Sequence, residues 1–153
     1  MKILLAVDGS AFSEAAAKSV ANRPWPPDSG IKIITVIEPF QPYTLEPWAM
    51  PAEYWNDLVK LAQQQANQAI EMATRQFNNV QGVAISTQIV KGSPKAVILD
   101  EAEAWGADLI VLGSHGYTGL KRMFLGSVSQ AVTSHAHCAV EIVRSREVSQ
   151  EAA

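Results

Sequence analysis

The sequence predicts an α/β protein with one five-stranded, mostly parallel sheet and helices on both faces, which is a doubly wound arrangement. Short apolar runs typical of strands alternate with longer segments of helical periodicity, and strands joined through helices run parallel. The chain has 153 residues, the length of a single domain. Its glycine- and proline-containing loops follow the strands, at the edge where sheets of this kind bind ligands.

The first part of the chain supplies two strands and a helix. Residues 2–7 form a short apolar run that stops at Asp8-Gly9-Ser10, so they predict the first strand. The alanine-rich segment 13–21 has helical spacing and ends before a proline-rich turn at 24–27. Residues 31–37 predict the second strand.

The middle of the chain predicts a loop, a long helix and a third strand. Residues 39–51 contain four prolines and form the least predictable segment, because loops of this length are uncommon unless they are functional or mobile. Residues 52–77 are rich in Gln and Ala and contain no Gly or Pro, so they predict a helix. The alternation in 83–90 predicts the third strand.

The last part predicts two strands and two helices. Ser93 is the expected cap of a helix over 95–105, with Pro94 at its first position. Residues 108–112 predict strand four. A helix is expected over Ser127–His135, and Ala139–Val143 closes the sheet as strand five.

Composition excludes several classes of protein. With 48% hydrophobic residues the chain can bury a core of its own, and we expect one domain over 1–146 followed by a disordered tail, 147–153. The longest apolar runs are far shorter than a membrane span, and we expect neither a signal peptide nor a membrane partner. A net charge of −3 offers no footprint for nucleic acid. The single cysteine, Cys138, fits a cytoplasmic location.

The most informative motif follows strand four. It consists of Gly113-Ser114-His115-Gly116, nine further residues, and then Gly126-Ser127. Glycines let phosphate oxygens approach main-chain N–H groups, and Ser127 suits the cap of the following helix, so the motif favours a phosphorylated ligand. The alternative is that these are ordinary turn glycines between a strand and a helix.

Other loops support the first interpretation, because they fall on the same edge of the predicted sheet. Asp8 follows strand one, the proline-rich loop follows strand two, and Lys91-Gly92 follows strand three. The glycine spacing matches neither the Walker A loop nor the dinucleotide fingerprint.

The pattern instead resembles that of the universal stress protein family, whose ATP-binding members carry Gly, two residues, Gly, nine residues, then Gly and Ser or Thr. Gly113, Gly116, Gly126 and Ser127 match all of it. The resemblance spans nearly the whole chain and includes further motifs, Val7-Asp8-Gly9-Ser10 with Ser13, Gly92 with Pro94, and His135-Ala136-His137-Cys138. It implies a Rossmann-like fold of the universal stress protein type.

The resemblance also implies an adenine-nucleotide site. Asp8 would accept a hydrogen bond from adenine, Val36 would meet the base through its backbone, and Gly113 would lie against the ribose. Apolar walls around the base would come from Ala6, Val7 and Leu112. The phosphates would be surrounded by His115, Gly116, Gly126, Ser127, Val128 and Ser129.

A triphosphate needs charge compensation beyond a helix dipole. We therefore expect Mg²⁺ bridged by the phosphates rather than held by protein ligands, with Lys121 and Arg122 as flexible helpers. The expected cofactors are ATP, or AMP or ADP, with Mg²⁺.

The favoured function is that of a nucleotide-dependent stress-response sensor or interaction module, without a catalytic residue and with at most weak ATPase activity. The alternatives are a slow ATP-hydrolysing enzyme and an AMP-binding regulatory protein, and a flavin-binding domain is more remote. The sequence contains no Walker lysine and no kinase-like Asp and Asn pair, and phosphoryl transfer depends on such positioned groups.

Several of these residues also allow a purely structural interpretation. Asp8 is a candidate cap for the first helix, and His115 is a candidate solvated loop histidine. His135, His137 and Cys138 lack the second pair of ligands that a structural zinc site needs, so a structural role is favoured. A group of aromatic residues in or near the proline-rich loop favours a packing surface over a base-stacking platform; it comprises Phe40, Tyr43, Trp48, Tyr54 and Trp55.

The final strand predicts a homodimer. Family members commonly pair through this strand and have proline after the cysteine, where this chain has Ala139. Ala139 restores a main-chain N–H, and Glu141 is the only charge within Ala139–Val143, so the edge is an open template for pairing. The protein partner of such a module is not indicated.

Overall fold

A computed structural model describes residues 1–40, 51–116 and 125–145 of the chain. They form a five-stranded sheet in the order β3-β2-β1-β4-β5, and every neighbouring pair of strands is parallel. The strands are β1 (Lys2–Ala6), β2 (Ser29–Ile37), β3 (Val83–Lys91), β4 (Leu109–Gly113) and β5 (Ala139–Val143). The helices are α1 (Ala11–Ala21), α2 (Ala52–Arg75), α3 (Pro94–Trp105) and α4 (Ser127–His135).

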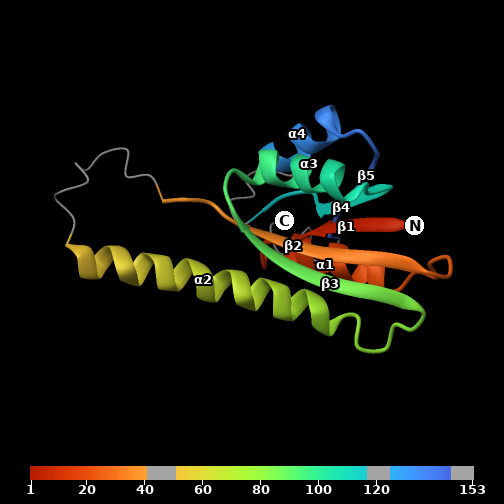
Figure 1. Ribbon diagram of the computed structural model, residues 1–153, viewed down its shortest axis with the longest axis horizontal. Coiled ribbons are helices and arrows are strands. Elements are labelled where there is room, and N and C mark those ends of the chain that lie inside the picture. Colours follow the sequence, from red (N-terminus) through yellow and green to blue (C-terminus); the bar gives the residue numbers. More distant parts are fainter. Residues whose placement is uncertain (41–50, 117–124, 146–153) are drawn as a thin grey trace, which may run out of the picture.

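Helices cover both faces of the sheet, as predicted (Figure 1). Ile3 and Leu5 of β1 point to one face, where α1 and α2 complete a core that includes Val20 and Phe77. Leu4 points to the other face, where α3 and α4 pack. All five residues of β4 are buried, as expected for an inner strand of a parallel sheet.

Element boundaries differ from the predicted ones by a few residues. Helix α1 begins at Ala11 because the Ser10 hydroxyl accepts a hydrogen bond from the Ser13 N–H, 3.2 Å, and so caps the helix. At α3, Ser93 is the N-cap residue and Pro94 opens the helix as predicted, although the Ser93 side chain makes no capping hydrogen bond. Ser127 is not a cap: Gly126 is the N-cap residue of α4, and Ser127 is the first helical residue.

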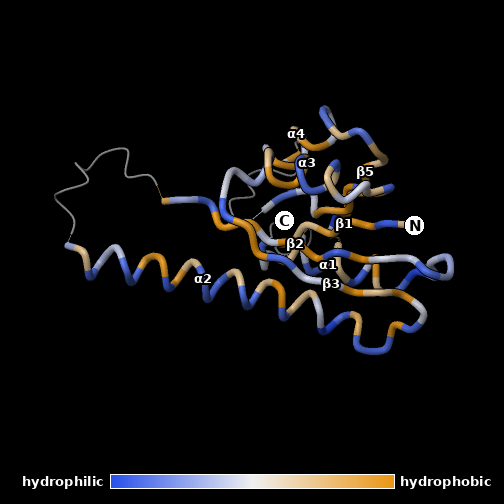
Figure 2. Tube along the Cα trace, in the orientation of Figure 1, coloured by the Kyte–Doolittle hydropathy of each residue, from blue (hydrophilic) through white to orange (hydrophobic). Residues whose placement is uncertain are grey.

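Helix α2 extends well beyond the sheet. Its buried residues, Ala66, Ala69 and Ala73, all lie in its second half. In Figure 1 the first half projects away from the strands, and Figure 2 shows apolar and polar positions alternating along its whole length. The sheet therefore fixes only one end of this helix.

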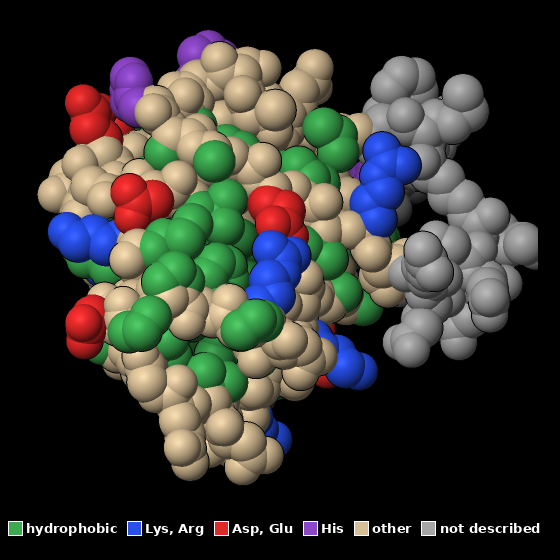
Figure 3. All heavy atoms as spheres, turned by 90° about the vertical axis from the view of Figure 1, so that its right-hand side faces the viewer, with side chains coloured by type: hydrophobic (Ala, Val, Ile, Leu, Met, Phe, Trp, Pro, Cys, Tyr) green, Lys and Arg blue, Asp and Glu red, His purple; other side chains and the backbone are tan. Residues whose placement is uncertain are grey.

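The face at the amino ends of the strands combines apolar and charged groups. Figure 3 shows hydrophobic side chains in the middle of this face, with basic and acidic side chains around and among them. At this end of the molecule the Lys2 and Lys32 ammonium groups lie 5.7 Å and 4.8 Å from the ring centroid of Trp105. Such cation–π contacts let a lysine cover an apolar ring while its charge stays in water.

Strand β5 is an edge of the sheet, and its side chains are committed to the fold. Val140 and Ile142 pack against the core on the α3 and α4 face, while Glu141 forms a bidentate ion pair with Arg23, including a 2.6 Å hydrogen bond to Oε2. Because the Ser114 N–H donates to the Val143 carbonyl, 2.9 Å, and peptide direction alternates along a strand, the amides of Val140 and Ile142 point away from β4. These two N–H groups are therefore directed toward the edge of the sheet.

No helix in the described residues is long and apolar enough to cross a membrane.

The Arg23–Glu141 pair should make the stability of the fold depend on pH. The hydrogen bonds that Arg23 donates to the Glu141 carboxylate lower the pKa of Glu141, whereas burial raises it by a smaller amount. A depressed pKa in the folded state stabilises the fold above the unfolded pKa of about 4.3, and this contribution is lost as the pH falls through the folded value. The pair is about a third exposed, so we expect Glu141→Gln to cost up to about 1 kcal/mol at neutral pH.

Urea denaturation of both proteins between about pH 7 and pH 3 checks this expectation. The difference in unfolding free energy between wild type and Glu141→Gln should shrink towards zero on acidification. A difference that stays constant over this range would contradict the assignment.

Candidate functional site

A cavity of about 580 Å³ opens at the carboxyl edge of the sheet, where the ends of β1, β2 and β4 meet the first turns of α3 and α4. Every site residue predicted from the sequence lines it: Ala6, Val7, Asp8, Val36, Leu112, Gly113, His115, Gly116, Gly126, Ser127, Val128 and Ser129. Parallel strands place their carboxyl ends at one edge, which is why segments far apart in the sequence converge here.

Asp8 presents a carboxylate to this cavity. It is exposed, and its Oδ1 accepts a hydrogen bond from the Ser10 N–H at 2.9 Å, which fixes the side chain beside the start of α1. Ser10 rather than Asp8 caps the helix, so the capping interpretation of Asp8 is wrong. The second oxygen lies against Gly116, where a Cβ atom would come within 2.7 Å of Oδ2. Gly116 thus makes room for the carboxylate.

Gly113 has a packing role. A Cβ atom at this position would lie 2.7 Å from the carbonyl carbon and oxygen of Phe12, so the missing side chain lets α1 approach the end of β4. From the other side, the buried Ser129 hydroxyl donates to the Gly113 carbonyl at 2.8 Å. The turn-glycine interpretation therefore explains Gly113 without a ligand.

Gly126 sits where the loop meets α4. Its N–H donates to the Ser114 carbonyl at 2.8 Å, and a Cβ atom would lie 3.3 Å from that oxygen and from the His115 Cα. Its φ of −60° is one that any residue adopts, so close approach rather than backbone conformation favours glycine. No side chain caps α4, and the N–H groups of its first turn have no acceptor further back in the helix.

His115 is held in the wall of the cavity. Its Nδ1 lies 3.0 Å from the Ser114 hydroxyl, and its ring packs on Phe12 with a centroid distance of 5.2 Å. Nε2 is buried and has no hydrogen-bond partner among the residues that the structure describes. A buried polar atom without a partner costs about 1–3 kcal/mol, so this nitrogen marks a place where a polar ligand atom fits. His115 is therefore not the freely solvated histidine that the sequence alone allows.

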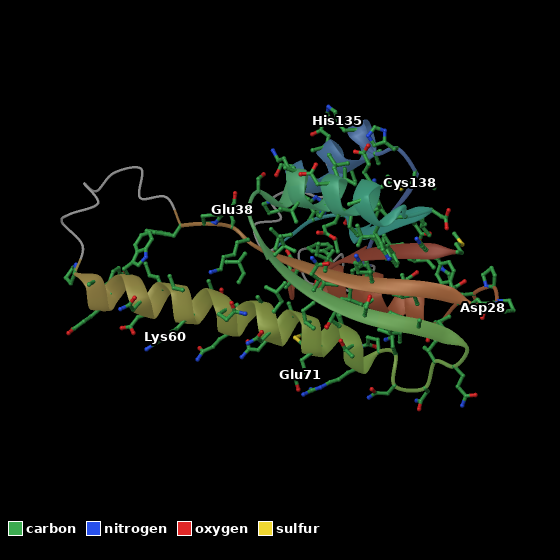
Figure 4. All side chains as sticks on the ribbon, viewed as in Figure 1. Asp28, Glu38, Lys60, Glu71, His135 and Cys138 are labelled. Atoms are coloured by element: carbon green, nitrogen blue, oxygen red, sulfur yellow. The ribbon has the colours of Figure 1, made fainter. Side chains whose placement is uncertain are left out.

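The charges of the described cavity wall are negative. Asp8 and Glu38 are its only charged residues within the described ranges, and Glu38 extends from the end of β2 (Figure 4). Lys121 and Arg122, the basic residues expected to help with phosphates, lie outside the described residues. The positive end of the α4 dipole is the feature of this wall that favours an anion.

Six lining residues were missed by sequence reasoning: Ser13, Ile34, Glu38, Pro94, Ile98 and Leu125. Glu38 directly follows a predicted strand, so its position could have been found by the same rule that found Asp8. Ile98 lies one turn after Pro94 in α3, and only the packing of that helix over the sheet brings both to the cavity.

The histidines near β5 have protein partners within the described residues. His135 Nδ1 lies 2.9 Å from the Ala131 carbonyl, and His137 Nε2 lies 3.7 Å from a Glu103 carboxylate oxygen. Burial, with a contribution from the nearby Asp108 charge, raises the pKa of the Cys138 thiol and favours its neutral form. The described residues contain no group of three or more His, Cys, Asp or Glu that could hold a metal ion.

The described aromatic residues of the predicted group lie outside the cavity wall. The rings of Phe40 and Trp55 meet edge to face at 6.1 Å, and Tyr54 is exposed on α2. Tyr43 and Trp48 lie outside the described residues. Phe40 and Trp55 thus form a packing contact, and Tyr54 stays exposed.

Comparison with known proteins agrees with this geometry. The model of the universal stress protein family matches residues 1–144. The chain belongs to the universal stress protein family. It is similar to a universal stress protein of Methanocaldococcus jannaschii, with 35% identity over 144 residues, which cover 94% of this chain and 81% of that protein.

Solved structures share the fold. The hypothetical protein MJ0577 superposes with a TM-score of 0.79 at 30% identity, covering 95% of this chain and 96% of the other. UspA from Lactobacillus plantarum gives 0.76 at 26% identity, covering 94% and 97%. Two members with the same fold but lower identity carry ligands: an Arabidopsis thaliana protein with AMP bound (TM-score 0.68, 19%, covering 97% and 94%) and a universal stress protein in complex with cAMP (0.58, 22%, 94% and 96%).

The contact between Gly113 and Phe12 generates a stability prediction. Gly113→Ala should destabilise the fold by about 1–3 kcal/mol, because the added methyl group meets main-chain atoms that cannot rotate away. Gly30→Ala is the matched control, since its Cβ would lie 3.5 Å from the Trp105 ring, an ordinary contact. Chemical denaturation of both variants measures the difference. Equal stabilities would show that α1 can move away from β4 without cost.

Proposed function

We propose that the cavity binds an adenine nucleotide and that the protein acts as a nucleotide-dependent sensor or interaction module in a stress response. The observation that carries the proposal is the arrangement of one cavity wall. A carboxylate from the end of β1 and the uncapped first turn of α4 line the same cavity, together with the unpartnered Nε2 of His115. The two proteins of this fold that carry AMP and cAMP support it.

Asp8 would recognise the base. Its Oδ1 is occupied by the Ser10 N–H, which leaves Oδ2, beside Gly116, to accept a hydrogen bond from the adenine amine. Ala6, Val7 and Leu112 supply apolar contacts around the base, and the main chain of Val36 meets its polar edge. Guanine carries a carbonyl oxygen where adenine carries the amine, so a fixed carboxylate disfavours it.

The phosphates would lie at the start of α4. Ser127 and Val128 bring main-chain N–H groups to the cavity, Gly126 keeps side-chain atoms out of this part of the wall, and His115 can donate from Nε2. The Ser129 hydroxyl is already bonded to the Gly113 carbonyl, so we assign Ser129 to positioning the loop and, through its N–H, to the anion. Gly113 would face the ribose.

A divalent cation would accompany a triphosphate. Asp8 and Glu38 add negative charge to the described wall, and a helix N-terminus contributes only about 0.3–2 kcal/mol. Mg²⁺ bridging the phosphate oxygens would offset the charge of ATP, whereas AMP needs less compensation.

The alternatives of an AMP-binding regulatory protein and a slow ATP-hydrolysing enzyme rest on the same cavity, and nucleotide turnover by the purified protein distinguishes them. The expected cytoplasmic location stays a prediction.

Two substitutions test the opposite ends of the site. Asp8→Ala should weaken adenosine, AMP and Mg²⁺-ATP at least about tenfold, because it removes the acceptor for the base. His115→Ala should weaken AMP and Mg²⁺-ATP by a similar factor while leaving adenosine unchanged. Isothermal titration calorimetry measures both, with circular dichroism as the check on folding. If both variants bind all three ligands as tightly as the wild type, the cavity is not a nucleotide site.

We also propose that β5 pairs with the β5 of a second copy to form a homodimer. Because the Ile142 N–H points away from β4, Ile142→Pro tests the pairing by removing an outward N–H without removing a bond to β4. Ile142→Ala is the control, since it reduces the same side chain and keeps the N–H. Sedimentation analysis should show a twofold lower mass for Ile142→Pro, whereas Ile142→Ala should keep the mass of the wild type. The same loss in both variants would point to damaged core packing instead.

A further inference from the structure

The first half of α2, residues 52–65, has large apolar side chains that the described part of the fold leaves exposed. From Ala66 onward the helix buries Ala66, Ala69 and Ala73 against the rest of the molecule. Before Ala66, large hydrophobic side chains remain in solvent: Tyr54 is 54%, Trp55 41%, Val59 46% and Leu61 49% exposed. We refer to residues 52–65 as the free half of α2.

The exposed face continues the stripe that packs on the sheet. Positions 55, 59 and 62 precede 66, 69 and 73 with spacings of three and four residues, so all six lie on one side of the helix. Leu58, Tyr54 and Leu61 lie about 60°, 100° and 120° round the axis from Trp55, all in the same direction, and widen the exposed face on that side. The residues change from alanine, where the helix lies close to the sheet, to Trp55 and Val59, where it projects beyond the sheet (Figure 1). Phe40 contacts one side of Trp55 and leaves the rest of that ring exposed.

The charges of the free half lie on the opposite side. Glu53, Asp57 and Lys60 are each about 140–200° from Trp55 around the helix axis. Figure 4 shows Lys60 and, further along, Glu71 on the side of α2 that points away from the sheet. Uncharged Gln63 borders the apolar face, and uncharged Gln65 lies within it. Two identical copies of this face can therefore meet without bringing like charges together.

The exposed area suits a weak but specific pairing. At about 200 Å² for a fully exposed side chain of this size, the four large residues expose roughly 400 Å² per chain, or roughly 800 Å² for two chains. A total of roughly 800 Å² lies below the roughly 1,200 Å² of stable interfaces and in the range of weak, transient pairings.

We propose that the free half of α2 is an interface for a second copy of this chain, formed by two antiparallel helices related by a two-fold axis. An isologous pairing that buries the whole face must centre on the middle of the free half, at Leu58 and Val59. This arrangement sets Trp55 of each copy against the small Ala62 of the other, so bulky and small residues interlock. The inference goes beyond nucleotide binding and does not depend on it.

Sedimentation velocity between about 1 µM and 1 mM tests the pairing. Val59→Lys combined with Leu61→Lys places charges in the exposed face. At high concentration this variant should have half the mass of the wild type. Asn56→Lys combined with Gln64→Lys is the charge-matched control on the polar side and should associate like the wild type. Ile142→Pro, which disrupts pairing through β5, should still associate through α2. Equal masses for the wild type and the α2 variant would overturn the proposal and leave this face to a different protein.

Disulfide trapping tests the geometry directly. In a Cys138→Ala background, Leu58→Cys should form a linked dimer rapidly, because pairing holds two copies of this position at an effective concentration in about the millimolar range. Gln64→Cys, on the polar side, should cross-link only at the rate of random collision. Equal cross-linking rates at the two positions would overturn the antiparallel arrangement.

Discussion

The close approach of α1 and α4 to the end of β4 is the constraint on which the rest of the site depends. Gly113 lies between the two helices: the Phe12 backbone occupies the space of its missing side chain, and the buried Ser129 hydroxyl binds its carbonyl. These contacts fix the segment Ser114 to Gly116, which in turn receives the Gly126 N–H. The cavity is therefore a product of helix packing, and its loop residues are held in place before any ligand arrives.

This explains why glycines with similar sequence context have different tasks. Gly113 accommodates a helix, Gly116 accommodates the Asp8 carboxylate, and Gly126 accommodates the neighbouring loop. The sequence motif predicts that side chains must be absent at these positions. It does not reveal what occupies the space, because Phe12 and Asp8 reach the motif only through the folded sheet.

The same distinction separates what the sequence predicted from what it did not. The sheet and its helices followed from alternating strand and helix periodicity, and the cavity position followed from the rule that carboxyl ends of parallel strands share an edge. The role of Ser10 as the α1 cap was hidden because Asp8, Ser10 and Ser13 are all good capping residues. The inward direction of Val140 and Ile142 could not be predicted either, since a short apolar edge strand has no clear alternation.

The alanines of α2 have a mechanical consequence. Ala66, Ala69 and Ala73, with Ile70, anchor the second half of the helix, and the residues before this fulcrum form an arm about 21 Å long. A rotation of about 10° at the fulcrum moves the tip of such an arm by about 4 Å. Phe40, which touches Trp55 on this arm, lies two residues from Glu38 in the cavity wall. A shift of Phe40 that accompanied a change at Glu38 would therefore act on the part of α2 that lies furthest from its anchored half.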